Sequence, residues 1–145
     1  MSKIVIGIDP DSKAHGVATY IDGVLHDLAT LNNLDIYNMV EHKYWGSNVT
    51  FSIEDVNGVS AAFGARDSGR NIHVKLKMAQ SIGMCKQAQI ELERILENSY
   101  VKVVKHNISK MWKKDKAQFE KVTGWKGRSN EDTRSAAYFG WLSSK

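Results

Sequence analysis

The sequence predicts a single α/β domain, a five-stranded mixed sheet flanked by helices. Three apolar segments follow one another closely near the N-terminus, at residues 3–9, 14–21 and 23–30. Strand-like and helix-like segments then alternate along the rest of the chain, which is typical of α/β proteins. The 145 residues suffice for one domain, 1–145, with a hydrophobic core, and no repeat or linker divides them.

The first three segments are expected to be strands joined by short turns. The turn between the second and third lies at Asp22-Gly23, a dipeptide typical of two-residue hairpins because Gly adopts positive φ without strain. The first segment ends on Asp9, and the following Pro10 favours an extended backbone at that acid.

The middle of the chain is expected to form a helix, a strand and a loop. The helix covers residues 34–44, with its apolar positions at Leu34, Tyr37, Met39 and Val40. The strand covers residues 49–54, which alternate and include β-branched residues, and it too ends on an acid, Glu54. Residues 57–72 contain three glycines among charged residues, which indicates a loop.

A long helix is expected over about residues 73–98. Its buried stripe is predicted at the helical spacing of Met84, Ala88, Leu92 and Ile95. Met78 and Cys85 are expected to belong to the same core.

The remaining chain is expected to form one strand and two helices. The strand covers residues 100–105, and Ser109 is expected to cap a helix over 109–122. The last helix covers about 131–142, with Ser129 or Asn130 as its cap.

Composition places the chain among globular proteins. Hydrophobic residues make up 42% and charged residues 25% of the sequence. No apolar run approaches the ~18 residues of a membrane span, and the N-terminus lacks the features of a signal peptide. The single Cys85 cannot form an internal disulfide. A cytoplasmic protein without a membrane partner is expected.

Charge is distributed unevenly along the chain. Residues 1–72 hold five Lys or Arg against nine Asp or Glu, whereas residues 73–128 hold thirteen against five. An acidic part that holds cations and a basic part that binds phosphates would suit a polyanion-binding protein. Solvated helix faces are the alternative interpretation.

Three acids are candidates for one metal site. If the strands that end at Asp9 and Glu54 are neighbours, their carboxylates meet at one edge of the sheet and repel unless they share a proton or a cation. Mg²⁺ suits such a pair because it prefers hard oxygen ligands. Asp132 lies in the first turn of the last helix, where an acid also complements the helix dipole. The small residues at 135–137 would bring this helix close to the sheet.

Four motifs together resemble the RuvC-type Holliday-junction resolvases of the ribonuclease-H-like superfamily. They are "IGIDPDSKAHGVA", "FSIEDV", "MAQSIGMCKQAQIELERIL" and "NEDTRSAAYFGW", in that order, and the resemblance covers residues 4–142. The short chain is similar to phage-encoded members. The resemblance implies a ribonuclease-H-like fold and a homodimer that cuts four-way DNA junctions in DNA recombination, repair or phage DNA processing.

The resemblance also implies two-metal chemistry, with two Mg²⁺ ions about 3.5–4 Å apart and Mn²⁺ as a substitute. Asp9, Glu54 and Asp132 match the family's catalytic and metal-binding acids. A further acid or histidine is expected three residues before the last Asp, where this chain has Ser129. Glu131 is therefore the preferred fourth catalytic and metal residue, and Asn130 is a possible neutral ligand. Asp11 is either a metal ligand or a turn residue.

DNA contacts are expected in two segments. The resemblance places phosphate contacts in the lysine-rich segment, at Lys110, Lys113, Lys114 and Lys116. Lys110, Lys113, Lys114 and Lys121 are predicted to share one face of the helix 109–122. In the loop 57–72, Arg66 and Arg70 are candidates to clamp the DNA backbone, and Phe63 either stacks on bases or packs the loop.

Three functions remain open from the sequence. The first is a Mg²⁺-dependent endonuclease that resolves four-way and other branched DNA. The second is a related nuclease that acts on forks, RNA–DNA hybrid or structured RNA. The third is a branched-DNA-binding module without catalytic activity.

Overall fold

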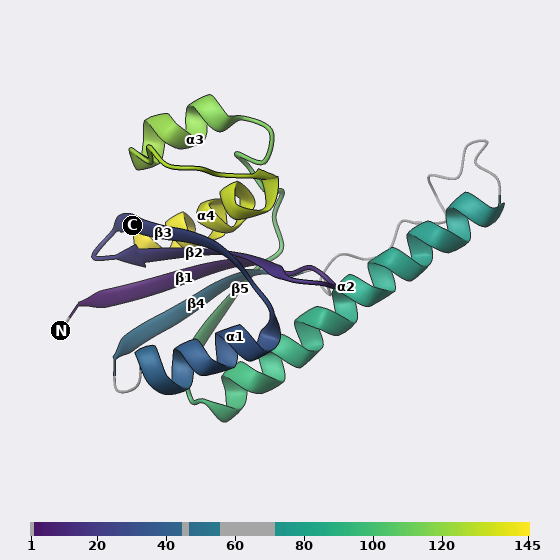
Figure 1. Cartoon of the computed structure of the whole chain (residues 1–145), viewed down its shortest axis with the longest axis horizontal. Helices are drawn as coiled ribbons and strands as arrows, with labels where there is room; N and C mark the ends of the chain where they lie inside the picture. Colours follow the sequence, from purple (N-terminus) through teal and green to yellow (C-terminus); the bar gives the residue numbers. More distant parts are fainter. Residues whose placement is uncertain (1, 45–46, 56–71) are drawn as a thin grey trace.

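The sheet has the strand order β3-β2-β1-β4-β5 in the computed structural model, which describes residues 2–44, 47–55 and 72–145 (Figure 1). Its strands are β1 (Lys3–Asp9), β2 (His15–Ile21), β3 (Val24–Leu31), β4 (Asn48–Glu54) and β5 (Lys102–His106). The first three strands are antiparallel neighbours, whereas β4 is parallel to both β1 and β5. The predicted five-stranded mixed sheet is confirmed.

The turn between β2 and β3 forms as its sequence predicts. Asp22 and Gly23 both have positive φ, 49° and 84°, and Ile21 pairs directly with Val24. The Asp22 carboxylate also accepts a hydrogen bond from the backbone N–H of Lys3 at 2.9 Å. This contact ties the hairpin to the first residue of the central strand.

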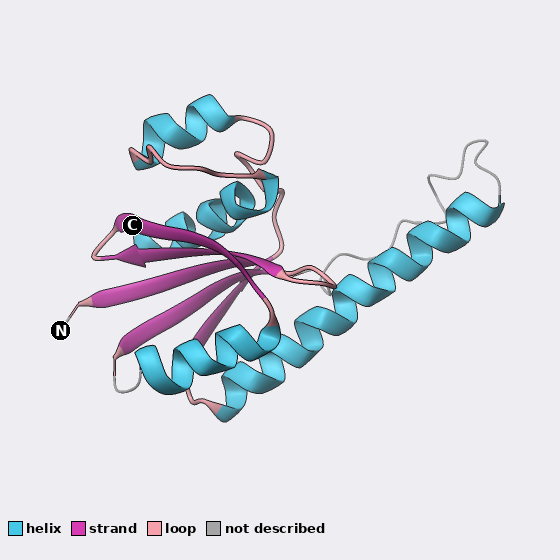
Figure 2. Ribbon diagram, in the orientation of Figure 1, coloured by secondary structure: helices cyan, strands magenta, loops and turns pink. Residues whose placement is uncertain are grey.

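Helices cover both faces of the sheet (Figure 2). On one face lie α1 (Asn33–Asn38), the π-helical turn η1 (Met39–Lys43) and α2 (Ile72–Asn98). On the other lies α4 (Glu131–Ser144), with α3 (Lys116–Thr123) outside it (Figure 1). None of the helices in these described ranges is both long and apolar enough to span a membrane.

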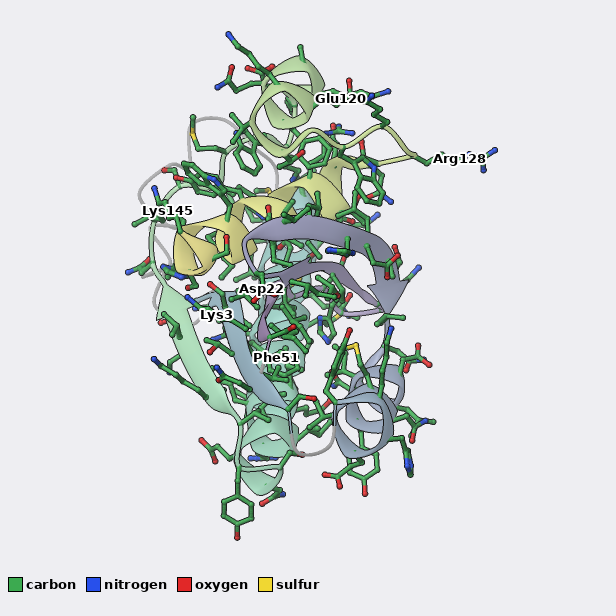
Figure 3. All side chains as sticks on the ribbon, turned by 90° about the vertical axis from the view of Figure 1, so that its left-hand side faces the viewer. Lys3, Asp22, Phe51, Glu120, Arg128 and Lys145 are labelled. Atoms are coloured by element: carbon green, nitrogen blue, oxygen red, sulfur yellow. The ribbon has the colours of Figure 1, made fainter. Side chains whose placement is uncertain are left out.

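Successive side chains of β1 point to opposite faces of the sheet and so belong to two different hydrophobic cores. Ile4, Ile6 and Ile8 pack with residues of α1 and α2, whereas Val5 packs with α4. Phe51 of β4 is fully buried in the first core and lies in the middle of the molecule in Figure 3. Because alternate residues of β1 face the same side of the sheet, Asp9 lies on the α4 side with Val5, and this is the side of the candidate site.

Helix α4 lies against the sheet without side chains between them at two positions. A Cβ atom on Gly7 would overlap the Ala136 carbonyl and the backbone of Gly140, and one on Gly16 would overlap the Asp132 backbone. Ser135, Ala136 and Ala137 are fully buried at this contact. The predicted close approach of the last helix to the sheet is therefore present.

The first helical segment differs from its prediction in which residues are buried. Ile36 and Val40 face the core, and Met39 packs partly against it. Leu34 and Tyr37 are exposed, although both were expected on the apolar side. The capping box of Asn32 and Asp35 starts the helix.

The buried stripe of α2 is shorter than predicted. Ala88, Leu92 and Leu96 are buried, whereas Met84 is 49% exposed and Met78 is exposed. Cys85 and Ile95 are partly buried. The N-terminal half of α2 extends beyond the edge of the sheet, so its apolar residues have no sheet face to cover (Figure 1).

The predicted helix over 109–122 is wrong in its first half. Only α3 is helical, because Asp115 caps it by accepting from the N–H of Gln118. Trp112 has a positive φ of 68° and is buried against Phe119, Tyr138 and Trp141. Residues 107–115 are therefore a non-helical segment, and the predicted lysine face of that helix does not exist.

Candidate active site

Asp9 and Glu54 meet at the carboxyl ends of two parallel strands. Ile8 pairs with Ile53, so the next residue of each strand is an acid. Both acids have the parity that faces α4: Ser52, two residues before Glu54, donates to the Phe139 carbonyl of that helix at 2.6 Å. Asp9 is only 4% exposed and Glu54 is partly buried. The predicted meeting of these two acids is present.

The ammonium group of Lys110 lies between the two carboxylates. Its Nζ atom is 3.1 Å from Glu54 Oε2 and 3.4 Å from each carboxylate oxygen of Asp9. Lys110 was predicted as a phosphate contact. In the structure its partners are the two acids.

Asp132 is brought next to Asp9 by the docking of α4. Asn130 caps this helix by accepting from Thr133 N–H, while Thr133 Oγ1 accepts from Asn130 N–H, which leaves Asp132 in the first turn. The Asp132 backbone packs on Gly16, and Gly16 is the partner of Asp9 in the β1–β2 ladder. Asp132 is partly buried beside the Asp9–Glu54 pair.

Burial and charge repulsion change the protonation of these acids. The pKa of Asp9 is raised to about 7, mainly by burial and then by the hydrogen bond and charge of Glu54, against the opposing effect of Lys110. Burial and the charges of Asp9 and Asp11 raise the pKa of Asp132. Burial opposes the charge of Lys110, but the two carboxylates outweigh this effect and raise its pKa. The site thus concentrates negative charge in a region poor in water.

The oxygen atoms at this edge suit a hard divalent cation. Glu54 Oε2 is buried and has no hydrogen bond of good geometry, since its contact with Lys110 is ionic only. Carboxylate oxygens are hard donors of the kind that Mg²⁺ prefers. Among the described residues, no three His, Cys, Asp or Glu side chains are close enough together to hold an ion. Asp9 and Glu54 are therefore the pair that fits a cation, and Asp132 lies beside them.

The other candidate ligands have different surroundings. Ser129 accepts a hydrogen bond from Arg134 at 3.0 Å, and Asn130 is the helix cap. Glu131 is exposed, next to the partly buried Asp132. Asp11 accepts from Ser12 N–H at 2.6 Å, which agrees with its interpretation as a turn residue.

Two residues of α4 beside the acids were missed by sequence reasoning. Ser135 Oγ is buried without a hydrogen bond of good geometry, and it lies close enough to Asp9 to lower the pKa of that carboxyl. Arg134 donates to the carbonyls of Trp112 and Lys113 and so holds the segment that carries Lys110. The i, i+3 spacing of Ser135 from Asp132 was the available signal, because it places both on one helix face.

Two residues on the opposite face of the sheet were also missed. His15 accepts from Asp11 N–H at 3.0 Å and contacts Asn33 Oδ1 at 2.7 Å, which closes the turn after Asp9. Gln89 of α2 is fully buried and donates to Asp55 at 3.0 Å. These contacts hold a residue that follows each of the two strand-end acids: the Asp11 backbone after Asp9 and the Asp55 side chain after Glu54.

The predicted DNA-binding residues fall into three groups. Lys113 lies close enough to Asp132 to lower the pKa of that acid. Lys114 and Lys116 are exposed. Phe63, Arg66 and Arg70 lie outside the described residues.

A hollow with two lysines in its lining lies at the C-terminal end of α3. Its volume is about 500 Å³, and it is lined by Glu120, Lys121, Gly124, Trp125 and Lys126. Trp125 is fixed there by a hydrogen bond from its indole N–H to the Arg128 carbonyl at 2.9 Å. The Arg128 side chain extends outward from the same loop (Figure 3).

Comparison with known proteins supports the fold. No protein-family model matches the sequence, and no curated protein matches it either. Among solved structures, Thermus thermophilus RuvC in complex with a Holliday junction substrate is similar, with a TM-score of 0.57 and 12% sequence identity. The match covers 96% of this chain and 90% of that one. A second Thermus thermophilus RuvC structure gives a TM-score of 0.51 at 11% identity and covers 95% and 91% of the two chains. The chain therefore has a RuvC-like, ribonuclease-H-like α/β fold.

Proposed function

We propose that this protein is a Mg²⁺-dependent endonuclease that hydrolyses phosphodiester bonds in branched DNA, chiefly in four-way junctions. The observation that carries the proposal is the meeting of Asp9 and Glu54 at the ends of parallel strands, with Asp132 beside them on α4. The fold is that of RuvC, which has been solved with a Holliday junction substrate.

Asp9 and Glu54 would hold the metal, and Asp132 would complete the site from α4. Bound divalent ions would activate water and stabilise the leaving oxygen. Glu131 is retained as the fourth catalytic and metal residue of the proposal. Asp9 must lose its proton before it binds a cation, so its pKa of about 7 makes metal binding weaker in acid.

The basic residues beside these acids would bind the phosphates of the substrate. Lys113 is placed to do so near Asp132, and Lys114 and Lys116 extend the positive surface into solvent. If several phosphates are neutralised, log K should fall with log salt by about 0.9 for each contact on duplex DNA.

A homodimer is part of the proposal, because symmetric cleavage of a four-way junction needs two active sites. Leu76 and Met84 are 60% and 49% exposed on the half of α2 that extends beyond the sheet (Figure 1). Exposed apolar side chains of this kind support a contact between two copies of the chain.

A strand-mapped cleavage assay on mobile and fixed four-way junctions tests this function. The native protein with Mg²⁺ or Mn²⁺ should introduce paired nicks. Asp9→Asn and Asp132→Asn should each lower the cleavage rate at least about 100-fold. Mutation of residues that only hydrogen-bond to metal ligands already costs up to about 100-fold, and the loss of a ligand itself should cost no less. Asp27→Asn, which removes an exposed carboxylate on β3, is the matched control and should cleave normally.

Competition among a four-way junction, a fork, an RNA–DNA hybrid and plain duplex identifies the substrate class. Preference for a fork or hybrid would replace the junction by the second candidate substrate. Junction binding by the native protein without cleavage of any substrate would contradict the nuclease and indicate a binding module.

A further inference from the structure

Lys110 has an unusual position for a lysine of a DNA-binding surface. Its Nζ atom lies within 3.4 Å of three carboxylate oxygens from two different strands. Those acids are largely buried, with side chains 6% and 15% exposed, whereas the Lys110 side chain is 29% exposed. The ammonium group is thus a tethered cation at the open side of the acidic pair.

We propose that Lys110 is an internal counter-ion that competes with the divalent cation for Asp9 and Glu54 and leaves the site when the cation binds. The inference rests on the metal site of the proposed function. A cation shared by both carboxylates would lie between them, where Nζ lies now. Two positive groups at that distance repel each other and need the same oxygen atoms.

The backbone around Lys110 favours a movement of the side chain alone. Arg134 donates to the carbonyls of Trp112 and Lys113, and the Trp112 indole is buried against α4. These contacts hold the segment in place. The lysine stem has four rotatable carbons and one exposed side, so the ammonium can turn toward solvent without unfolding the segment.

The exchange gives Lys110 two partners, one after the other: first the two acids, then a substrate phosphate. Before metal binding it neutralises the acids, which would otherwise repel each other. After metal binding the released ammonium lies at the edge of the site, where it can contact a substrate phosphate. The predicted role of Lys110 in DNA binding then depends on the metal.

The first test measures Mg²⁺ affinity by titration calorimetry without DNA, so that cleavage plays no part. Lys110→Met removes the competing charge and keeps the length of the stem. Mg²⁺ should then bind about tenfold more tightly, because the native site is open to metal only in the fraction of molecules whose lysine has left. The same variant in EDTA should melt at a lower temperature than the native protein, and Mg²⁺ should raise its melting temperature more.

Lys102→Met is the matched control. It removes the same charge from an exposed position on β5, and its Mg²⁺ affinity should equal that of the native protein. Unchanged or weaker Mg²⁺ binding by Lys110→Met would overturn the proposal, since a lysine that helps to hold the metal site together would have that effect.

A second test uses the native chain and does not depend on the folding of a variant. Acylation of lysines by a water-soluble ester is followed by peptide mass spectrometry with and without Mg²⁺. Lys110 should react several-fold faster with Mg²⁺, whereas Lys102 should react at the same rate. Equal rates at Lys110 would contradict the exchange. Neither test measures cleavage, so a failure of the nuclease assay and a failure of this inference can be told apart.

Discussion

The ionisation of Asp9 affects both the proposed metal binding and the stability of the fold. Its pKa is raised to about 7, chiefly by burial and then by Glu54. A carboxyl whose pKa is higher in the folded than in the unfolded chain stabilises the fold below the unfolded value of 3.8. That stabilisation is lost as pH rises through 7. The ionised form that binds metal is therefore the form that destabilises the metal-free protein.

Asp9→Asn should stabilise the metal-free protein at high pH while it abolishes cleavage. The quantity to compare is the free energy of unfolding of Asp9→Asn minus that of the native chain. This difference should be up to about 3 kcal/mol larger at pH 8 than at pH 5, because only the native chain must ionise a buried carboxyl group as pH rises. Denaturant unfolding in EDTA at the two pH values measures it. Asp27→Asn should show no such pH dependence, and an equal gain at both pH values would contradict the assignment.

His15 contributes a pH dependence of opposite sign. Burial lowers its pKa, so its neutral form stabilises the fold above the unfolded value of 6.5. This contribution is lost as pH falls and the ring must take up a proton, since Nδ1 then can no longer accept from Asp11 N–H. The His15 contribution to stability in EDTA should therefore fall as pH drops below 6.5, in the direction opposite to the Asp9 contribution. The stability difference between the native chain and His15→Gln should therefore shrink as pH falls, which unfolding curves of both proteins between pH 4 and pH 8 would measure.

The sequence allowed some of these residues to be predicted and not others. Asp9 and Glu54 end apolar strands, and the strand pattern predicted that they meet at one edge if the two strands are neighbours, as they are in the structure. The partners of Lys110 and Ser135 depend on where α4 and the segment before α3 dock. The spacing of Ser135 from Asp132 places the two on one helix face, but no local pattern indicates where that face or Lys110 docks.

At the level of elements, the docking of α4 on β1 and β2 positions the third acid. Gly16 is the critical contact, because it pairs with Asp9 in the ladder while its open side accepts the Asp132 backbone. Any side chain at this position would push the start of α4 away from the sheet. The distance between Asp132 and Asp9 therefore depends on a residue that has no functional group.

Gly16→Ala should lower cleavage and stability together. Overpacking at such a contact costs about 1–3 kcal/mol. Gly83→Ala is the control, because a Cβ atom there meets nothing within 4 Å, and Ala in a helix should add about 1 kcal/mol of stability. Thermal unfolding and junction cleavage of both variants test this. Normal cleavage by Gly16→Ala would show that the position of Asp132 is not critical.

The segment before α3 shows why an element can be predicted wrongly. Its helical spacing of lysines and Trp112 is real, but tertiary contacts outweigh it. Burial of the Trp112 ring among aromatic residues and the hydrogen bonds from Arg134 to two carbonyls stabilise a non-helical backbone. The Asp115 cap then starts α3 later.

At the level of the whole molecule, α2 extends beyond the domain that it packs on. Its C-terminal half covers the sheet with Leu92 and Leu96, both fully buried. Its N-terminal half carries Leu76 and Met84 in exposed positions (Figure 1). The strict helical periodicity of the sequence predicted one continuous buried stripe, because periodicity does not indicate where the sheet ends.

Leu76→Glu combined with Met84→Glu should weaken the proposed dimer and leave the fold intact. Each apolar side chain buried in an interface contributes about 1.5–3 kcal/mol. Removing two should raise the dimer dissociation constant by at least about 100-fold. Light scattering after gel filtration over a range of protein concentrations measures this, and Val24→Glu, at an exposed apolar position on β3, is the matched control.

If the double variant and the native chain have the same molar mass at every concentration, this half of α2 does not form the dimer contact. If the double variant is monomeric and makes single rather than paired nicks in a four-way junction, two active sites are needed for symmetric cleavage.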